Sequence, residues 1–300
     1  MTALEIAKRR LPRLQVVGRL ERPRELATGL LLLSPTLALL VGLYVYPLII
    51  VLSRSLTDPR VGFDNYTALW QSVAFRNIMT NTFEIALWTT LICVLLGYPL
   101  AYRIATLPPL WSRVLLALTL LPFFTAILAR LYAWTIILGD EGVVNTYLLQ
   151  WGVIHQPLAL LFDRTGVVIG TVHYMLPYMI LILYSSMLNI DDSLLQAARS
   201  LGASRLYAFR RVFLPLTLPG VYAGSLLVFI ISLGFFLTPA VLGGGRDVTI
   251  ATFVQEQIGI LAWGAAAAMC VVLLAITTVL FLFFNRLYGT DRLLVGGLRK

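Results

Sequence analysis

The sequence predicts an all-α protein, a polytopic membrane helix bundle with about six transmembrane helices. Its 300 residues are 59% hydrophobic and only 12% charged, and their mean hydropathy is +0.87. A typical soluble domain carries about 25% charged residues. Apolar runs of the length that crosses a bilayer lie at 28–52, 80–102, 114–138, 166–188, 219–242 and 264–285. The bundle should therefore occupy residues 28–288, without a separate soluble domain.

The first apolar run follows an arginine-rich stretch, residues 1–27, which we expect to form a cytoplasmic tail that is flexible or lies along the membrane surface. The run at 28–52 is longer than the about 7–15 residues of a signal-peptide core and lacks a small-x-small cleavage site. It therefore predicts a retained helix. The turn-forming residues at 57–66 that follow it predict an outer loop.

The second and third runs each contain an ionisable residue, Glu84 and Arg130. Charged side chains are costly in hydrocarbon and usually face a partner or a water-filled path. Three interpretations stay open: a structural Glu84–Arg130 pair, contact with a substrate, and snorkelling at the lipid edge. Four aromatic residues are further candidates for a substrate path, because rings can form a gate or bind a cation; helix packing is the alternative. They are Tyr132, Trp134, Phe235 and Phe236.

The connection after the third run, residues 139–162, is too polar to span a membrane and too apolar to extend freely into water. It predicts a short helix at the outer membrane face, where Tyr147 and Trp151 suit the interface.

Cys93 and Cys270 fall inside apolar runs without a CxxC motif, which favours packing over a disulfide or a metal site. No metal site is expected.

The polar stretch between the fourth and fifth runs, residues 189–218, predicts a short docking helix and a turn. Ser193 and Gln196 have the spacing of a capping box, which predicts that a helix begins at Ser193. Ala197 and Ala198 remove side-chain bulk from the next turn.

The second half of this stretch reverses the chain direction. Gly202, followed by Ala203, can end the helix, and Ser204 can cap a further helical turn. Pro215 suits the first turn of a helix that returns into the membrane. Together these residues predict a compact elbow that docks on another protein.

This stretch resembles the cytoplasmic loop of binding-protein-dependent ABC importer permeases, whose pattern is E-A-A, three residues, G, and later a hydrophobic-L-P. Here the pattern reads Gln196-Ala197-Ala198, then Gly202, then Phe213-Leu214-Pro215. Gln196 replaces the usual glutamate, which keeps the capping geometry and loses the negative charge. The residues around the motif, including Gly234 to Pro239, resemble the spermidine/putrescine-type subfamily. The resemblance covers about residues 28–288 and implies the type I importer permease fold.

The resemblance implies a permease subunit that translocates a small solute, a polyamine or a related organic ion, delivered by a periplasmic or extracellular solute-binding protein. It implies a second permease subunit, expected to be a homologous distinct chain, a dimer of ATP-binding subunits, and membrane lipid as surroundings. Coupling to the ATPase is implied for Gln196, Ala197, Ala198, Gly202, Ala203, Ser204 and Pro215. The expected location is the bacterial inner membrane.

The distribution of the basic residues along the chain predicts its orientation in the membrane. Of the 23 lysines and arginines, 17 lie in the two termini and in the alternate loops that include 189–218. The positive-inside rule therefore places both termini and this loop in the cytoplasm, with residues 289–300 as a C-terminal tail. Their distribution by membrane side argues against a nucleic-acid partner.

Catalytic motifs are missing from the sequence. The only lysines, Lys8 and Lys300, do not lie in a G-x-x-x-x-G-K-[ST] loop, so ATP and Mg²⁺ should belong to the partner ATPase and no cofactor to this chain. No nucleophile and base are paired, which places an intramembrane enzyme third. The alternative to the importer is a gradient-driven secondary transporter or channel, which internal repeats would favour and the polar elbow disfavours.

Overall fold

The computed structural model describes residues 23–245 and 247–288, and this part of the chain is helical without a β-strand. The chain divides into two units, residues 1–50 and 51–300. The predicted C-terminal tail at 289–300 and residues 1–22 of the predicted N-terminal tail lie outside the described residues. Residues 23–27 belong to helix α2, so the first helix begins earlier than the apolar run indicates.

The first unit contains α2 (Pro23–Leu40), the π-helical turn η1 (Val41–Val45) and the start of α3 (Tyr46–Thr57). Pro47 lies in the first turn of α3. It has no backbone N–H, so it cannot donate a hydrogen bond to the carbonyl oxygen four residues earlier, in η1. A π turn changes the hydrogen-bonding register at that place. The same arrangement recurs where Pro215 follows η3 (Phe209–Phe213).

The second unit contains the remaining elements. They are α4 (Asp64–Gln71), α5 (Val73–Thr106), α6 (Pro109–Leu120), η2 (Leu121–Phe124), α7 (Ile127–Leu138), α8 (Val143–Gln150), α9 (Arg164–Leu188), α10 (Asp192–Ser200), α11 (Arg205–Ala208), η3, α12 (Leu214–Leu233), α13 (Leu237–Leu242), α14 (Ile250–Gly259) and α15 (Trp263–Tyr288). Helix α8 is the short helix predicted within 139–162.

Five helical stretches of the described residues are long and apolar enough to cross a membrane: Leu32–Thr57, Val73–Thr106, Arg164–Leu188, Arg205–Leu233 and Trp263–Arg286. A sixth candidate is the pair Pro109–Phe124 and Ile127–Gln150, which is bent by 95°. The predicted all-α bundle of about six transmembrane helices is therefore confirmed.

Two predicted runs were wrong as single helices. The run at 114–138 is interrupted after η2, where Thr125 is extended and its hydroxyl donates to the carbonyl oxygen of Pro122 at 2.8 Å. The run at 219–242 ends at Leu233, and α13 follows as a separate short helix. Hydrophobicity alone does not reveal these breaks, because the residues on both sides are apolar.

The core of the second unit lies where α5, α9 and α12 pack together. Met179 of α9 is fully buried between two glycines. A Cβ atom at Gly97 of α5 would lie 2.9 Å from the Met179 Cγ, and one at Gly224 of α12 would lie 2.8 Å from its Sδ. These glycines let the two helices approach α9 closely. Cys93 is buried in the same core as a free thiol.

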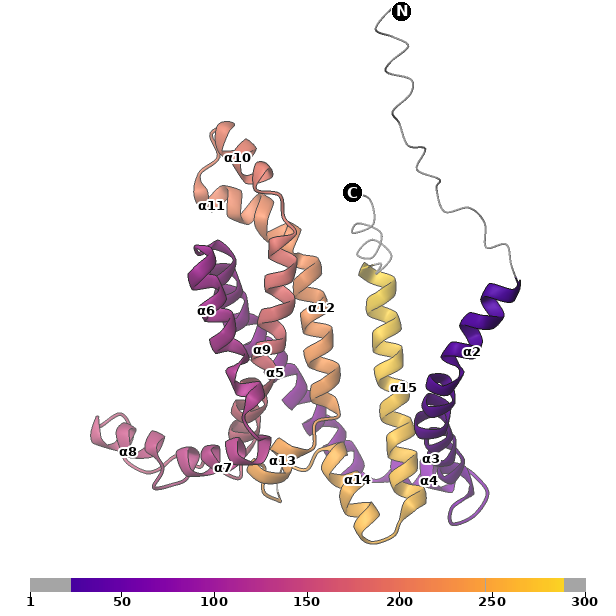
Figure 1. The fold of residues 1–300 in the computed structure, drawn as a ribbon. Coiled ribbons are helices and arrows are strands. Elements are labelled where there is room, and N and C mark those ends of the chain that lie inside the picture. The colour runs from indigo at the N-terminus through magenta and orange to yellow at the C-terminus, as the bar shows by residue number, and fades with distance from the viewer. Residues whose placement is uncertain (1–22, 246, 289–300) are drawn as a thin grey trace, which may run out of the picture. The chain divides into compact units, whose positions relative to one another are not determined.

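The two ends of this core carry different structures (Figure 1). The α10–α11 elbow lies at the end where α9 finishes and α12 starts, and α7, α13 and α14 gather near the opposite end. The carboxyl end of α5 belongs to the elbow end, because Ala101 and Ile104 share a core with Met187 and Phe213. Helix α6 must therefore run back along the core before α7 begins.

Candidate functional site

The elbow begins with α10, whose N-cap is Asp191. Its carboxylate oxygen Oδ1 accepts a hydrogen bond from the Ser193 backbone N–H at 2.8 Å. The predicted Ser193–Gln196 capping box was therefore wrong, because an aspartate is at least as good an N-cap as serine and comes earlier in the chain. Gln196 and Ala197 lie on exposed positions of the helix, and Ala198 is half-buried.

Gly202 ends this helix, as predicted, and does so by its backbone conformation. Its φ is +86°, and no atom of the described residues lies within 4 Å of where a Cβ would be. The N–H groups of Gly202 and Ala203 donate to the carbonyl oxygens of Arg199 at 2.9 Å and Ala198 at 3.0 Å. This is a Schellman C-cap, which favours glycine because L-residues pay for positive φ.

The second helix of the elbow starts as predicted at Ser204, whose hydroxyl oxygen accepts from the Tyr207 N–H at 3.2 Å. From Arg205 the helix continues through η3 to Leu233, so Pro215 lies inside a continuous span instead of starting it. The extra backbone room of η3 accommodates the proline ring.

The elbow exposes apolar side chains although its sequence is largely polar. Leu201 is 89% exposed, and Leu206 and Tyr207 are each 58% exposed. Exposed polar and basic side chains such as Gln196, Arg199 and Arg205 lie in the same elbow. An exposed apolar patch with a polar rim is typical of a surface that binds a protein partner.

An aromatic cluster, which the sequence analysis missed, connects the elbow to α5. The ring centroid of Tyr102 lies 5.4 Å from that of Phe209 and 5.2 Å from that of Phe213. The hydroxyls of Tyr98 and Thr217 are 2.9 Å apart. These contacts pack η3 and the start of α12 directly against α5.

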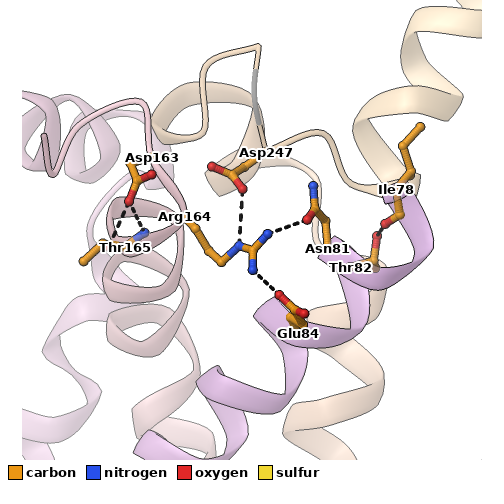
Figure 2. Close-up of polar contacts among 8 residues, drawn as sticks. All are labelled: Ile78, Asn81, Thr82, Glu84, Asp163, Arg164, Thr165 and Asp247. Carbon is orange, nitrogen blue, oxygen red and sulfur yellow. Dashed lines mark hydrogen bonds and ion pairs between the residues drawn. The ribbon is translucent and has the colours of Figure 1, made fainter. Parts of the chain in front are cut away.

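At the opposite end, Glu84 does not pair with Arg130, and this interpretation was wrong. Figure 2 shows the Glu84 carboxylate oxygen Oε2 accepting from Nη1 of Arg164. Arg164 Nε also lies 3.3 Å from Asp247 Oδ1, and its Nη2 lies 2.5 Å from Asn81 Oδ1. We call these four side chains the Arg164 cluster; it joins α5, α9 and the segment before α14.

A second bond near this cluster holds the same segment to α5. The Thr82 hydroxyl donates to the Ile78 carbonyl oxygen at 2.7 Å and accepts from the Ile250 N–H at 3.0 Å. Asp247 is buried. Arg164 could have been suspected from the sequence, because it lies two residues before the fourth apolar run, but its partners are more than 75 residues away in the sequence.

Arg130 instead stabilises the break after η2. Its Nη1 donates to the Pro122 carbonyl oxygen at 2.8 Å, and its guanidinium lies 5.1 Å from the ring centroid of Tyr174. Tyr174 stacks on Phe235 at 4.8 Å. Arg130 and Phe235, two of the candidate path residues, therefore both interact with the ring of Tyr174. The sequence analysis did not single out Tyr174.

The other aromatic candidates are placed differently. Trp134 Nε1 donates to Nδ1 of His173 at 3.2 Å, next to Tyr174 on α9. Tyr132 is 65% exposed, and Phe236 is half-buried just before α13. The structure brings Trp134 close to the aromatic group and leaves Tyr132 outside it.

An open, almost wholly apolar pocket of about 560 Å³ lies against α5, α12 and α15, and Glu84 is among its lining residues. The other lining residues are Met79, Thr80, Phe83, Leu87, Phe229 and Leu280. Phe83 and Phe229 meet edge to face with centroids 6.0 Å apart. In the described part of the chain, no group of three or more His, Cys, Asp or Glu residues could hold a metal ion.

Comparison with known proteins agrees with this arrangement. The profile of the family described as "Binding-protein-dependent transport system inner membrane component" matches residues 93–290. The spermidine/putrescine transport system permease protein PotB of Escherichia coli (strain K12) is 38% identical over 224 residues, which cover 74% of this chain and 81% of that protein. The PotB protein of Haemophilus influenzae is 37% identical over 197 residues, covering 66% and 68%.

Among solved structures, a chain of the bacterial alginate ABC transporter in complex with an alginate pentasaccharide-bound periplasmic protein superposes with a TM-score of 0.75 at 19% identity. The match covers 89% of this chain and 96% of that chain, and it shows a shared fold. The family match covers more than half of the sequence. This multi-pass chain therefore belongs to the family of inner-membrane permease components of binding-protein-dependent ABC transport systems.

Proposed function

We propose that this permease imports a polyamine, or a closely related organic cation, delivered by an external solute-binding protein. The observation that carries the substrate class is the 38% identity to a spermidine/putrescine permease over 74% of this chain. The family match favours an importer over a gradient-driven secondary transporter or channel.

In this proposal the elbow docks on a partner ATP-binding subunit, which holds ATP and Mg²⁺ and performs the hydrolysis. The exposed side chains of Leu201, Leu206 and Tyr207 support such a contact. When the two ATPase subunits close, they push on the elbow. The aromatic cluster around Tyr102 then passes the displacement to α5, and the bundle alternates between inward-open and outward-open states.

We further propose that the elbow and both termini face the cytoplasm. Arg199, Arg205, Arg210 and Arg211 support this orientation, because basic residues are retained on the cytoplasmic side. The end that carries α7, α13 and α14 then faces the binding protein. The second membrane subunit in this proposal is a homologous, distinct chain.

Among the candidate path residues, we assign Glu84 to the solute and Phe235 to a gate with Tyr174. Arg130 holds the η2 break, and Trp134 supports the gate through His173. Tyr132 and Phe236 contact lipid or the second membrane subunit. The charge of Arg130 disfavours direct contact with a polycation.

Uptake by the reconstituted complex tests the substrate. The permease pair, the ATPase and the binding protein are placed in vesicles with ATP inside, and uptake of labelled spermidine, putrescine, glutamate and maltose is measured. We expect ATP-dependent uptake of the two amines alone. ATP-dependent uptake of glutamate or maltose without the amines would contradict the proposal.

A further inference from the structure

Arg130 lies near the middle of the membrane-spanning region. Its guanidinium is 5.1 Å from the ring centroid of Tyr174, which comes ten residues after the first residue of α9, Arg164, and fourteen before the last, Leu188. At a rise of about 1.5 Å per residue, Tyr174 lies about 15 Å from one end of this span and about 21 Å from the other. Lipid phosphates lie outside a hydrocarbon core that is about 30 Å thick. A phosphate at either surface is therefore too distant to balance the charge of Arg130.

The described part of the chain supplies no counter-ion for this guanidinium. None of its carboxylates forms an ion pair with Arg130, and α7 and the neighbouring η2 and α9 contain no aspartate or glutamate. The hydrogen bond from Nη1 to the Pro122 carbonyl oxygen uses one of five N–H donors. Glu84 binds Arg164, at the start of α9. A charged side chain is costly in hydrocarbon and usually pairs with a group of opposite charge.

Aromatic rings surround Arg130 at the corner between η2 and α7. Tyr174 stacks on Phe235 at 4.8 Å, and the ring centroid of Tyr178 lies 5.9 Å from that of Tyr174 and 4.9 Å from that of Phe123. Phe123 is 37% exposed and the other members of this group are half-buried, so another molecule can cover them. Arginine and aromatic residues are enriched in the cores of protein–protein interfaces. Lipid tails could cover the rings but could not balance the charge.

We propose that the second membrane subunit covers this aromatic group and pairs one of its own aspartates or glutamates with Arg130 inside the hydrocarbon core. Charge complementarity supports this occupant, because the unmatched charge is positive and lies beyond the reach of lipid phosphates. The proposed polyamine carries the same sign as Arg130 and is repelled by it. The inference rests on the proposed second subunit and names the group through which that subunit recognises this chain.

Neutralising Arg130 in the assembled complex tests the pair. The chain is purified from membranes through a tag, and the amount of second membrane subunit per chain is measured. Arg130→Gln should retain about tenfold less second subunit, because the partner carboxylate is left without a cation, and Arg130→Lys should retain most of it. Arg54→Gln is the matched control and should retain all of it. Arg54 also lies over an aromatic ring, that of Trp263 at 5.3 Å, but in the last turn of α3.

A series of double substitutions identifies the acidic partner. Each intramembrane aspartate or glutamate of the second subunit is changed to its amide, alone and together with Arg130→Gln. We expect one position at which the single change lowers association and the combination restores it, because neither charge is then left unpaired. This restoration tests the pair even where Arg130→Gln alone folds poorly. The acidic residues near the ends of this chain should show no such coupling; they are Glu5, Glu21, Glu25 and Asp291.

Three outcomes would overturn the pair. The first is normal association of Arg130→Gln, with or without leakage of potassium ions through its vesicles; leakage would place Arg130 in a water-filled path. The second is the absence of coupling at every acidic position of the second subunit. The third is an association that varies with the phosphatidylglycerol content of the vesicles in wild type and not in Arg130→Gln, which would identify a lipid phosphate as the counter-ion.

Uptake by the same vesicles separates this inference from the proposed function. Amine uptake by a wild-type complex whose Arg130→Gln variant assembles normally contradicts the pair and leaves the polyamine importer in place. A coupled acidic residue in a complex that does not take up polyamines supports the pair and contradicts the proposed substrate.

Discussion

At the scale of single residues, Gly202 sets the angle between the two helices of the elbow. Its φ of +86° costs an L-residue about 1–2 kcal/mol, whatever the size of the side chain. No atom of the described residues lies within 4 Å of where its Cβ would be, so an added Cβ would not clash with them. The residue at this position is therefore restricted by its backbone conformation and by the surface through which we propose that the elbow binds its partner.

Gly202→Trp should therefore insert into the membrane at normal abundance and lose both uptake and association with the ATPase. Gly202→Asn should keep more uptake than Gly202→Ala, because asparagine tolerates the left-handed conformation better than alanine. The measurements are membrane abundance by immunoblot, co-purified ATPase and solute uptake. Normal uptake by Gly202→Trp would contradict a docking role.

Arg164 is the residue on which the Arg164 cluster depends. Arg164→Gln should lower stability, because it leaves Glu84 and the buried Asp247 facing each other without a cation. Breaking a fully buried pair costs about 3–5 kcal/mol. Since Arg164 and Glu84 are over a third exposed, solvent screening reduces the expected loss to about 1–2 kcal/mol.

Thermal unfolding of the purified complex measures this loss. Arg164→Lys should recover only part of it, because an ammonium group cannot reproduce the three directed bonds of the guanidinium. Adding Asp247→Asn to Arg164→Gln should recover stability. A double variant less stable than Arg164→Gln would show that Asp247 acts through other contacts.

At the scale of elements, some helices begin at a side-chain cap, as α5, α9, α10, α11 and α14 do. Asp163 caps α9 through Oδ2, which accepts from the Thr165 N–H at 3.1 Å and from its hydroxyl at 2.9 Å. These hydrogen bonds, the backbone one first, lower the pKa of Asp163 below its ordinary value of 3.8. The cap thus stabilises the ionised form.

Asp163→Ala should lower stability by about 1 kcal/mol at neutral pH. Because the pKa of Asp163 is lower in the folded protein than in the unfolded one, its contribution is fully present above pH 3.8 and is lost as the pH falls through the lowered value. The stability difference between wild type and Asp163→Ala should therefore shrink below pH 3.8. Unfolding in buffers from pH 7 down to about 3 measures it, and a difference that stays constant would contradict an ionic cap.

At the scale of the whole molecule, the path of the chain through the membrane decides which loops lie on the same side of it. A cysteine-free background with S204C on the elbow or G245C near α14 tests the path, because both positions are exposed and no atom of the described residues lies within 4 Å of a Cβ at Gly245. An impermeant thiol reagent should label G245C in intact cells and S204C only after the membrane is opened. Labelling of both from outside would contradict the orientation.

Local patterns predicted the helical class, the place of Gly202 and the cap at Ser204, because each depends on neighbouring residues. The partner of Glu84 could not be predicted, since Arg164 lies 80 residues away and the contact depends on the relative depth of α5 and α9. The break near Pro122 was hidden because apolar residues continue through it. The ring of Tyr174, which joins Arg130 to Phe235, carries no sequence signal of its own.

The break also makes one crossing unusually short. Helix α6 and η2 comprise 12 and 4 residues, which span about 25 Å. The hydrocarbon core of a bilayer is about 30 Å thick, so even a crossing perpendicular to the membrane requires the lipid beside it to thin. Uptake should therefore be faster in vesicles of 16-carbon lipids than in vesicles of 22-carbon lipids. Equal initial rates in the two would show that neighbouring subunits shield α6 from lipid.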